Sequence, residues 1–295
     1  MKKISGVYVA TVTPFTSKGE LDVDAYLSHL DYLKNAGIHG LVPCGTTGET
    51  PTLSDEERQK VIGLTCEFGK KHQLPVIAGA GGNCTSKVVD LLAEANDLGA
   101  DAALVVTPYY NKPNARGVLA HYRVLADKSP LPIVLYNVPP RTNVNMLPET
   151  VEEILKSDKV VGIKEASGNY SQWVELAHRI DWSQKALLAG DDDCVATMMA
   201  LGGSGVISAS ANVVPKLFVQ MVKAMENGDF KKAFELQISF QPMKKALFAE
   251  TNPTPSKFAL SVREQMQNKV RLPLVEVSSE TEALVRAALK IEGMQ

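Results

Sequence analysis

Short apolar runs alternate with longer amphipathic stretches along this chain, and that alternation limits its fold more than any other feature. Runs rich in β-branched residues occupy residues 7–13, 40–44, 75–80, 102–107, 133–137, 160–165, 186–189 and 205–208. Each run is followed by a polar or glycine-rich turn and then by a helical pattern. The runs are too apolar for a sheet with one face in water, so the pattern indicates parallel strands covered by helices.

Eight strand–helix units predict a (β/α)8 TIM barrel, because eight parallel strands close that fold. The barrel commonly takes about 250 residues, which suits a chain of 295. A doubly wound sheet usually has fewer strands and often a glycine-rich phosphate turn after the first. The first strand here ends in TPFTSKGE instead. We therefore predict a catalytic barrel over 1–228 and a C-terminal region of three helices over 229–295.

The charge balance gives no reason to expect a nucleic acid or a membrane as a partner. Lysine and arginine number 31 against 33 acidic residues, and no block of like charge stands out. The first apolar run is short, rich in threonine and closed by Pro14, and no segment reaches the roughly 18 apolar residues that cross a bilayer. We expect a cytoplasmic protein.

The cysteines and histidines do not form a metal-binding pattern. The four cysteines are widely spaced without a C-x-x-C pair, and the five histidines lack ligand spacing. We predict no metal site and no disulfide framework.

Lys164 is the most unusual residue of the predicted strands, because it ends the apolar run VVGIK. It could be a surface amine, a partner of Glu165, a phosphate anchor or a buried amine that attacks a carbonyl. In a barrel the active site lies at the carboxyl ends of the strands, where Lys164 lies. Adjacent strand residues face opposite sides, which argues against the pair with Glu165. Burial would favour the neutral, nucleophilic amine.

Three other strand ends carry residues suited to binding or proton transfer. The turn GTTGET at 45–50 offers hydroxyls and backbone N–H groups to a small anion, or it is an ordinary turn. Tyr136 could exchange a proton or simply pack in the core. Arg141 follows the rigid stretch NVPP and could bind a carboxylate, although surface arginines are common.

Four motifs in this order and spacing, GTTGE, TPYYNKP, YNVPPRT and GIKEASG, give the chain a resemblance to a known family. It resembles the dihydrodipicolinate synthases, pyruvate-dependent class I aldolases related to N-acetylneuraminate lyase. The resemblance runs from about Gly6 through the C-terminal helices. It implies an enzyme that uses no metal and no organic cofactor, and a homotetramer built as a dimer of tight dimers.

The resemblance also implies catalytic roles. Lys164 would form a Schiff base with pyruvate, and Tyr136 would move protons to and from the imine. Thr47 would link Tyr136 to Tyr110, which in this family reaches the site of the neighbouring subunit.

The substrates implied are pyruvate and L-aspartate 4-semialdehyde, and the product is 4-hydroxy-tetrahydrodipicolinate of the diaminopimelate and lysine pathway. Thr46 and Thr47 would hold the pyruvate carboxylate, and Arg141 the carboxylate of the aldehyde. The carbonyls of Gly190 and Ile207 would line the pocket. One alternative is a related aldolase such as N-acetylneuraminate lyase, but a neutral sugar aldehyde has less use for Arg141. The other is a barrel without catalysis, which the intact set of lysine, tyrosine and threonine argues against.

One region departs from the family pattern. Many bacterial members are inhibited by lysine at the dimer interface, where they often carry histidines and a glutamate. This chain has Asp55 and Arg58 in place of the histidines and Lys87 in place of the glutamate, while Asn83 and Tyr109 remain compatible. A cation at Lys87 would repel the ammonium of lysine, so we expect weak or no inhibition by lysine.

Overall fold

The computed structural model describes residues 3–291 and contains the eight predicted strands in one parallel sheet. The strands are β1 (Gly6–Ala10), β2 (Gly40–Val42), β3 (Ile77–Gly79), β4 (Ala102–Val106), β5 (Ile133–Asn137), β6 (Val160–Glu165), β7 (Ala186–Ala189) and β8 (Gly205–Ser208). Strands that follow one another in the chain lie side by side, and β8 pairs with β1. A parallel bridge between Leu41 and Val76 joins β2 to β3 and closes the barrel.

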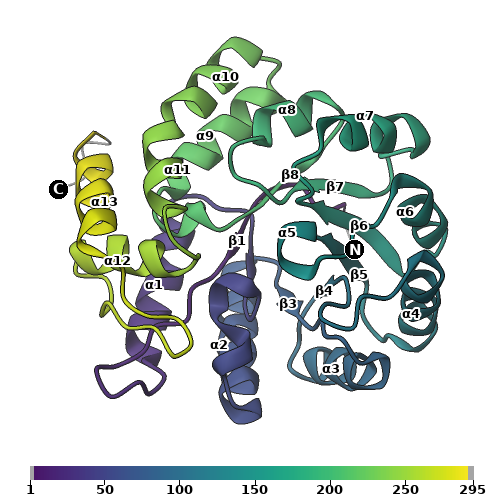
Figure 1. Cartoon of the computed structure of the whole chain (residues 1–295), viewed down its shortest axis with the longest axis horizontal. Coiled ribbons are helices and arrows are strands. Elements are labelled where there is room, and N and C mark those ends of the chain that lie inside the picture. The colour runs from purple at the N-terminus through teal and green to yellow at the C-terminus, as the bar shows by residue number, and fades with distance from the viewer. Residues whose placement is uncertain (1–2, 292–295) are drawn as a thin grey trace.

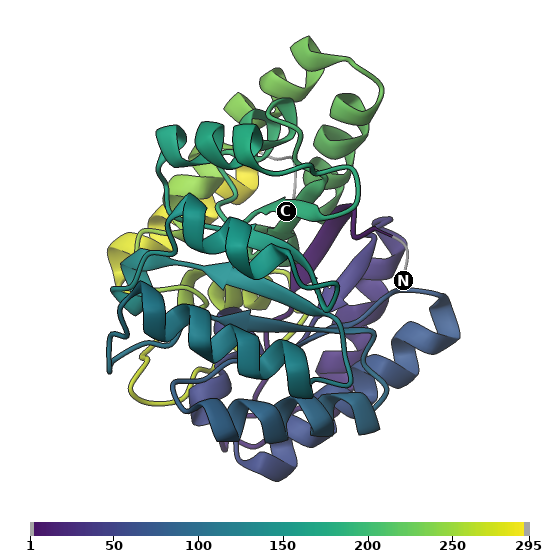
Figure 2. The ribbon, with the colours of Figure 1, turned by 90° about the vertical axis from the view of Figure 1, so that its right-hand side faces the viewer.

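A helix follows each strand and covers the outside of the barrel (Figure 1). These helices are α1 (Val23–Asn35), α2 (Asp55–His72), α3 (Thr85–Asp97), α4 (Ala115–Lys128), α6 (Pro148–Leu155), α7 (Tyr170–Arg179), α8 (Val195–Ala200) and α9 (Pro215–Glu226). The short α5 (Pro139–Thr142) lies in the loop between β5 and α6. Figure 2 shows part of this helical layer in front of the strands. The TIM barrel predicted from the sequence is confirmed.

The two faces of each strand serve two separate apolar clusters. On β5, Val134 and Tyr136 point into the barrel interior, whereas Ile133 and Leu135 pack against the surrounding helices. The period of two along a strand produces this division. Lys164 has the same parity as the inward-facing Gly162, so it belongs to the interior. The apolar character of the strands on both faces therefore has a direct structural cause.

Helix ends follow the signals in the sequence. Ser54 accepts a hydrogen bond from the backbone of Glu57, whose carboxylate accepts one from the backbone of Ser54, so α2 begins with a capping box. Pro148 is the first residue of α6. Gly37 and Gly99 have φ angles of +84° and +89° just after α1 and α3, conformations that glycine adopts without steric cost.

The first strand is shorter than predicted. It ends at Ala10 rather than Thr13, because the backbone N–H of Val12 donates to the side chain of Asn212 (3.1 Å) instead of continuing the sheet. Asn212 follows β8, which is next to β1 in the barrel, but it lies 200 residues from Val12 along the chain, so it leaves no signal in the local pattern.

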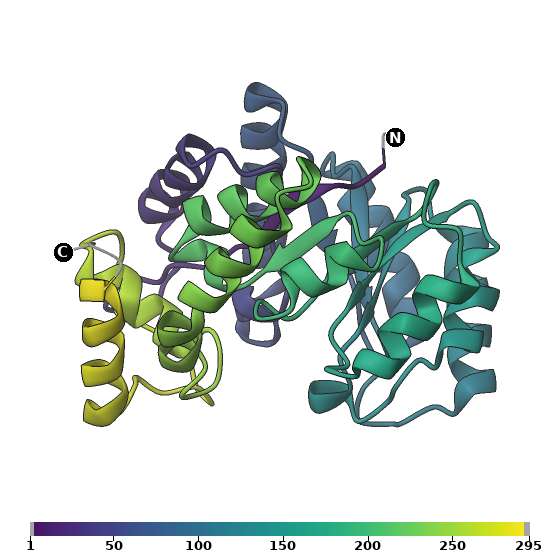
Figure 3. The same ribbon diagram turned by 90° about the horizontal axis from the view of Figure 1, so that it is seen from above.

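The C-terminal region contains four helices among the described residues rather than the predicted three. They are α10 (Phe230–Ser239), α11 (Gln241–Leu247), α12 (Thr254–Val262) and α13 (Ser279–Ile291). The sequence predicted one helix where α10 and α11 lie. The chain divides at Phe240, because Pro242 lacks the N–H that a continuous helix needs and favours the first turn of a new one. Figure 3 shows α12 and α13 at the end of the molecule opposite α4 and α6.

The helix α10 packs against α8 and α9 of the barrel. The division into a barrel over 1–228 and a helical region over 229–295 stays a prediction. Within residues 3–291 none of the helices is both long enough and apolar enough to span a bilayer.

The seam between β2 and β3 generates a stability prediction. The N–H of Gly79 donates to the carbonyl of Pro43 (2.9 Å), and a Cβ on Gly79 would lie 2.0 Å from the backbone oxygen of Cys44. We expect Gly79→Ala to lower the free energy of unfolding by about 1–3 kcal/mol, because the backbone of β3 must move away from Cys44 to make room for the Cβ. Denaturant unfolding measures the change.

A matched glycine in a helix serves as the control. A Cβ on Gly63, inside α2, would meet its nearest neighbour, a methyl of Leu98, at an ordinary 3.8 Å. We expect Gly63→Ala to raise the stability by about 0.5–1 kcal/mol. Equal unfolding midpoints for the two variants would contradict the expectation that the close approach of β3 to Cys44 contributes to stability.

Candidate active site

Lys164 lies inside the barrel near the carboxyl end of β6, and its side chain is 6% exposed. It is paired in register with Tyr136 of β5. Its Nζ lies 4.3 Å from the centre of the Tyr136 ring. The ring face attracts a positive charge and keeps water from one side of the amine.

The neighbouring carboxylate of Glu165 points to the other face of the sheet. It accepts hydrogen bonds from the side chain of Asn137 (3.0 Å) and the backbone of Ser167 (2.7 Å). Burial raises the pKa of Glu165, and these bonds oppose the rise. Glu165 thus has its own partners on the outer face of β6, as the alternation of strand side chains predicts.

The turn after β2 is a pair of short 3-10 helices, Thr46–Gly48 and Thr50–Thr52. Two hydroxyls fasten it, since Thr13 donates to the carbonyl of Gly48 (2.8 Å) and Thr50 to that of Gly45 (2.9 Å). The first N–H groups of a helix lack intrahelical acceptors and are free to bind an anion. Here they belong to Thr46 and Thr47.

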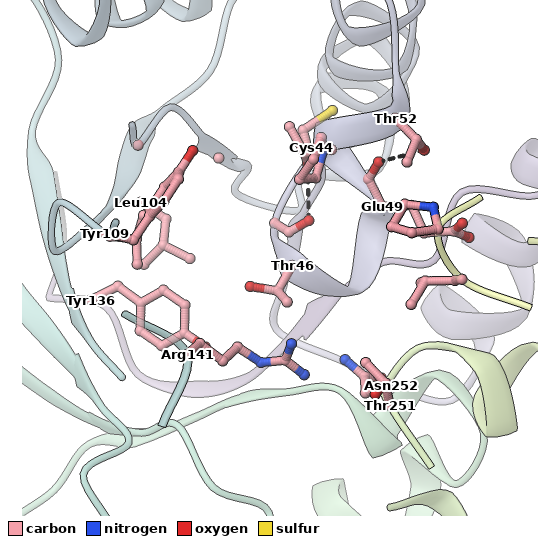
Figure 4. A pocket seen from close by; sticks show the side chains of 18 residues that line it. Cys44, Thr46, Glu49, Thr52, Leu104, Tyr109, Tyr136, Arg141, Thr251 and Asn252 are labelled. Atoms are coloured by element: carbon pink, nitrogen blue, oxygen red, sulfur yellow. Dashed lines mark hydrogen bonds between the residues drawn. The ribbon is translucent and has the colours of Figure 1, made fainter. Parts of the chain in front are cut away.

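A cavity of about 340 Å³ opens at the carboxyl end of the barrel. Thr46, Tyr109, Tyr136 and Arg141 line it from four different loops and strands (Figure 4). The chain from the C-terminal region supplies another wall, which includes Thr251, Asn252, Pro273 and Leu274. The site is therefore built by the barrel and the C-terminal region together.

Arg141 reaches the cavity from α5, where the two preceding prolines hold the backbone. Figure 4 shows its guanidinium pointing toward Asn252 and Thr251. The arginine is exposed, so its charge is available to a substrate entering from solvent. A fork of N–H donors in this position suits a carboxylate.

Other residues predicted for the site, Lys164, Thr47, Gly190 and Ile207, are not part of the cavity lining, and Lys164 is connected to the cavity through the ring of Tyr136. Thr47 is buried and its hydroxyl accepts a hydrogen bond from Asn252 (3.0 Å). Ile207 is fully buried inside the barrel. The backbone N–H of Gly190 donates to the carbonyl of Glu165 (2.8 Å). A side chain on Gly190 would collide with Ala166, since its Cβ would lie 2.6 Å away.

Tyr110 points away from the body of the single chain. It is 89% exposed and has a φ angle of +71°. Such a large aromatic surface on a strained backbone is available to a second molecule.

Two carboxylates after β7 were not assigned a role from the sequence. Burial and the neighbouring Asp192 and Asp193 raise the pKa of Asp191 to about 6, and Lys164 opposes the rise. Asp192 is buried and accepts from the backbone of Ser210 (2.8 Å), and burial raises its pKa. Negative charge here stabilises a cation at Lys164. The sequence signal that could have revealed these carboxylates is the run of three consecutive aspartates just after β7.

Four residues of the predicted regulatory region lie at or just before the starts of α2 and α3, and the fifth, Tyr109, follows β4 and lines the cavity. Arg58 is buried and forms an ion pair with Glu94 of α3. Asp55 and Lys87 are exposed. The carbonyl of Asn83 accepts a hydrogen bond from Asn111 (2.9 Å). Arg58 is therefore already engaged within the chain.

The geometry suits the chemistry of an amine with a carbonyl compound. A buried lysine lies against a tyrosine, and two threonines and an arginine offer donors for carboxylates above it. No group of three or more histidine, cysteine or acidic side chains within residues 3–291 could hold a metal ion.

Comparison with known proteins covers the entire chain. Residues 3–292 match the model of the dihydrodipicolinate synthetase family. The 4-hydroxy-tetrahydrodipicolinate synthase of Thermodesulfovibrio yellowstonii is 44% identical, over 98% of both chains. That of Methanocaldococcus jannaschii is also 44% identical, over 98% of this chain and 99% of its own.

Solved structures agree with these relatives. A crystal structure of dihydrodipicolinate synthase from Thermotoga maritima has a TM-score of 0.96 and 41% identity, over 99% of both chains. A structure described as the first monomeric dihydrodipicolinate synthase variant also has a TM-score of 0.96 and 41% identity, over 99% of this chain and 98% of its own. With sequence, fold and site geometry in agreement along its whole length, the chain belongs to the dihydrodipicolinate synthetase family.

Proposed function

We propose that this protein condenses pyruvate with L-aspartate 4-semialdehyde through a Schiff base on Lys164, which gives 4-hydroxy-tetrahydrodipicolinate for the diaminopimelate and lysine pathway. The observation that carries the proposal is the buried Lys164 amine against the ring of Tyr136, which itself lines the cavity together with Arg141. Relatives 44% identical along nearly their whole length are named for this reaction product.

The reaction begins when the neutral Lys164 amine attacks the keto carbon of pyruvate and water leaves. The protonated imine withdraws electrons, so the methyl group of pyruvate loses a proton and an enamine forms. The enamine carbon bonds to the aldehyde carbon of the second substrate, whose oxygen takes up a proton. The amino group of that substrate then attacks the imine carbon, which closes the ring and releases Lys164.

Tyr136 is positioned to exchange protons in these steps. Its ring contacts the Lys164 amine and it also lines the cavity. A phenol can act first as base and then as acid, provided that a relay returns the proton. We assign that relay to the Thr47 hydroxyl and to Tyr110 of a neighbouring subunit, because the chain's own Tyr110 is exposed. Thr46 and Thr47 hold the pyruvate carboxylate, and the carbonyls of Gly190 and Ile207 complete the pocket.

Arg141 selects the second substrate. Its side chain lines the cavity, with the guanidinium pointing toward Asn252 and Thr251, and offers a bidentate site for a carboxylate. An aldehyde derived from an amino acid has a carboxylate to place there. The sugar aldehyde released by N-acetylneuraminate lyase is neutral, so Arg141 favours the proposed reaction over that alternative.

Two exposed apolar surfaces support assembly as a dimer of tight dimers. Tyr110 and Leu272 near the cavity are 89% and 78% exposed, and they suit the tight contact that the relay requires. On α10, Phe230, Phe234 and Ile238 follow one another at helical spacing and are also exposed. Two separate contact surfaces on each chain are what a homotetramer built from two dimers requires.

The cytoplasmic location of the protein stays a prediction.

Reduction with borohydride tests the Schiff base. Incubated with pyruvate and borohydride, the parent protein should gain the mass of one reduced adduct, and Lys164→Ala should gain none and lose turnover. The control is Lys159→Ala, which removes an exposed lysine just before β6. An adduct that persists in Lys164→Ala would move the nucleophile elsewhere.

Kinetics with aspartate semialdehyde test the role of Arg141. A hydrogen bond to a charged group contributes about 1.5–3 kcal/mol, so Arg141→Ala should lower kcat/KM for the aldehyde by about 10–100-fold. Trapping of pyruvate should not change, because Lys164 remains. Arg116→Ala, which removes an exposed arginine of α4, is the control and should match the parent. An unchanged kcat/KM in Arg141→Ala would favour an aldehyde without a carboxylate.

Inhibition assays test the predicted regulatory region. We expect millimolar lysine to inhibit the parent weakly or not at all, because Lys87 repels the ligand's ammonium and Arg58 is paired with Glu94. The substitution Lys87→Glu replaces the cation with a carboxylate that attracts the ammonium, so it should strengthen inhibition by lysine. Strong inhibition of the parent that Lys87→Glu leaves unchanged would contradict the expectation.

A further inference from the structure

A buried ion pair joins the C-terminal helices to the turn that carries Thr47. The Nζ of Lys257 lies 2.5 Å from a carboxylate oxygen of Glu49, and both side chains are 0% exposed. The second carboxylate oxygen of Glu49 accepts from the backbone N–H of Arg271 (3.0 Å). Glu49 follows β2, whereas Lys257 belongs to α12 near the other end of the chain.

Stability alone does not explain such a pair. The loss of hydration on burying two ions offsets their attraction, and well-packed apolar residues in their place are often neutral or stabilising. Burial also lowers the pKa of Lys257 to about 8, against the attraction of Glu49. The groups that face the amine are the carboxylate of Glu49, the ring of Phe15 (4.1 Å to its centre) and the more distant charge of Arg271. Since the pair adds little net stability, we look for its role in the position that it gives to the two segments it joins.

Glu49 needs to be held, because its backbone has a left-handed conformation with a φ angle of +52°. For a residue with a side chain this costs about 1–3 kcal/mol and persists only where the surroundings enforce it. The N–H of Glu49 donates to the carbonyl of Thr46 (3.2 Å), and its own carbonyl accepts from Thr52 (2.9 Å). The conformation of Glu49 thus shapes the turn around Thr46 and Thr47.

A second contact joins the same two segments. Asn252, just before α12, donates from its side-chain amide to the hydroxyl of Thr47 (3.0 Å). Asn252 is buried and also lines the cavity. The ion pair at Glu49 therefore joins α12 to the same turn that Asn252 contacts. There the amide of Asn252 reaches the Thr47 hydroxyl and orients it.

We propose that Glu49 and Lys257 are a positioning pair for Thr47 and that they act through Asn252. Glu49 is among the residues that line the cavity, whereas Lys257 is not, and both carboxylate oxygens of Glu49 are bonded within the protein, one to Lys257 and one to the backbone of Arg271. The inference rests on the proposed role of Thr47 in the proton relay. It adds that the relay depends on a contact between the barrel and the C-terminal helices.

Kinetics of a variant without either charge test the pair. Glu49→Gln with Lys257→Met replaces both ions at similar volume and leaves no unpaired buried charge, so we expect the melting temperature to hold within a few degrees. A displaced catalytic group costs up to about 100-fold in rate, and we expect kcat to fall about tenfold or more. Glu49→Gln with Lys257→Gln, which also leaves no unpaired buried charge and keeps two polar side chains opposite one another, serves as a second variant if the first does not fold. Pyruvate trapping on Lys164 should persist.

A cycle with Asn252→Ala separates positioning from general destabilisation. If the pair acts through Asn252, adding Asn252→Ala to the double variant should slow it by less than twofold, although Asn252→Ala alone slows the parent. Lys257→Arg keeps the charge and should recover most of the rate. Two results would overturn the inference. One is a combined variant whose loss of rate is the product of the loss from Asn252→Ala and the loss from the Glu49→Gln, Lys257→Met variant. The other is a Glu49→Gln, Lys257→Met variant that is as fast as the parent.

Thr47→Val is measured beside these variants. A slow Thr47→Val with a fully active double variant would overturn only the positioning pair. A fully active Thr47→Val would overturn the relay role of Thr47 and the positioning pair together, while trapping on Lys164 would still support the Schiff base. Arg179→Met, which breaks ion pairs on the outer surface of α6 and α7, is the control and should keep the parental rate.

Discussion

The contact between Lys164 and Tyr136 inside the barrel is the interaction on which the rest of the structure depends. A lysine that is 6% exposed has given up most of its contact with water, and a charged or strongly polar group in such a place needs partners within the protein. The ring of Tyr136, whose centre lies 4.3 Å from Nζ, partly replaces the lost interactions with water, and the carboxylates after β7 supply opposite charge. The surrounding sheet must be rigid to hold an amine in so unfavourable a place, and a closed ladder of eight parallel strands is rigid.

Closure of the barrel also explains why the functional residues meet. All strands run in the same direction, so their carboxyl ends form one rim, and residues from several of these ends can meet at one cavity. Thr46 follows β2, Tyr136 is in β5 and Arg141 follows β5, yet all three line the cavity. The tight approach of β3 to the turn after β2, which only glycine permits at Gly79, brings this rim together.

The sequence predicted the features that depend on local periodicity and missed those made by distant contacts. The eight strands, the capping box at Ser54 and the place of Lys164 all followed from patterns within a few residues. The end of β1 did not, because Asn212 takes the hydrogen bond of Val12 from 200 residues away. The part played by Asn252 was missed for the same reason, since nothing near it in the chain relates it to Thr47. The break between α10 and α11 had a local signal in Pro242 that the helical pattern around it obscured.

The division of labour between the barrel and the C-terminal helices follows from these contacts. The barrel supplies the proposed nucleophile, Lys164, and the proposed proton-transfer residue, Tyr136, on strands whose positions the closed ladder fixes. The C-terminal region supplies the wall opposite Arg141, where the second substrate must fit, and that wall contains Asn252 and Leu274. Helices outside a closed ladder can change without disturbing the amine. A chain of this architecture can therefore change that wall of the cavity without moving Lys164, provided that the ion pair of Glu49 and Lys257 holds the C-terminal helices against the turn after β2.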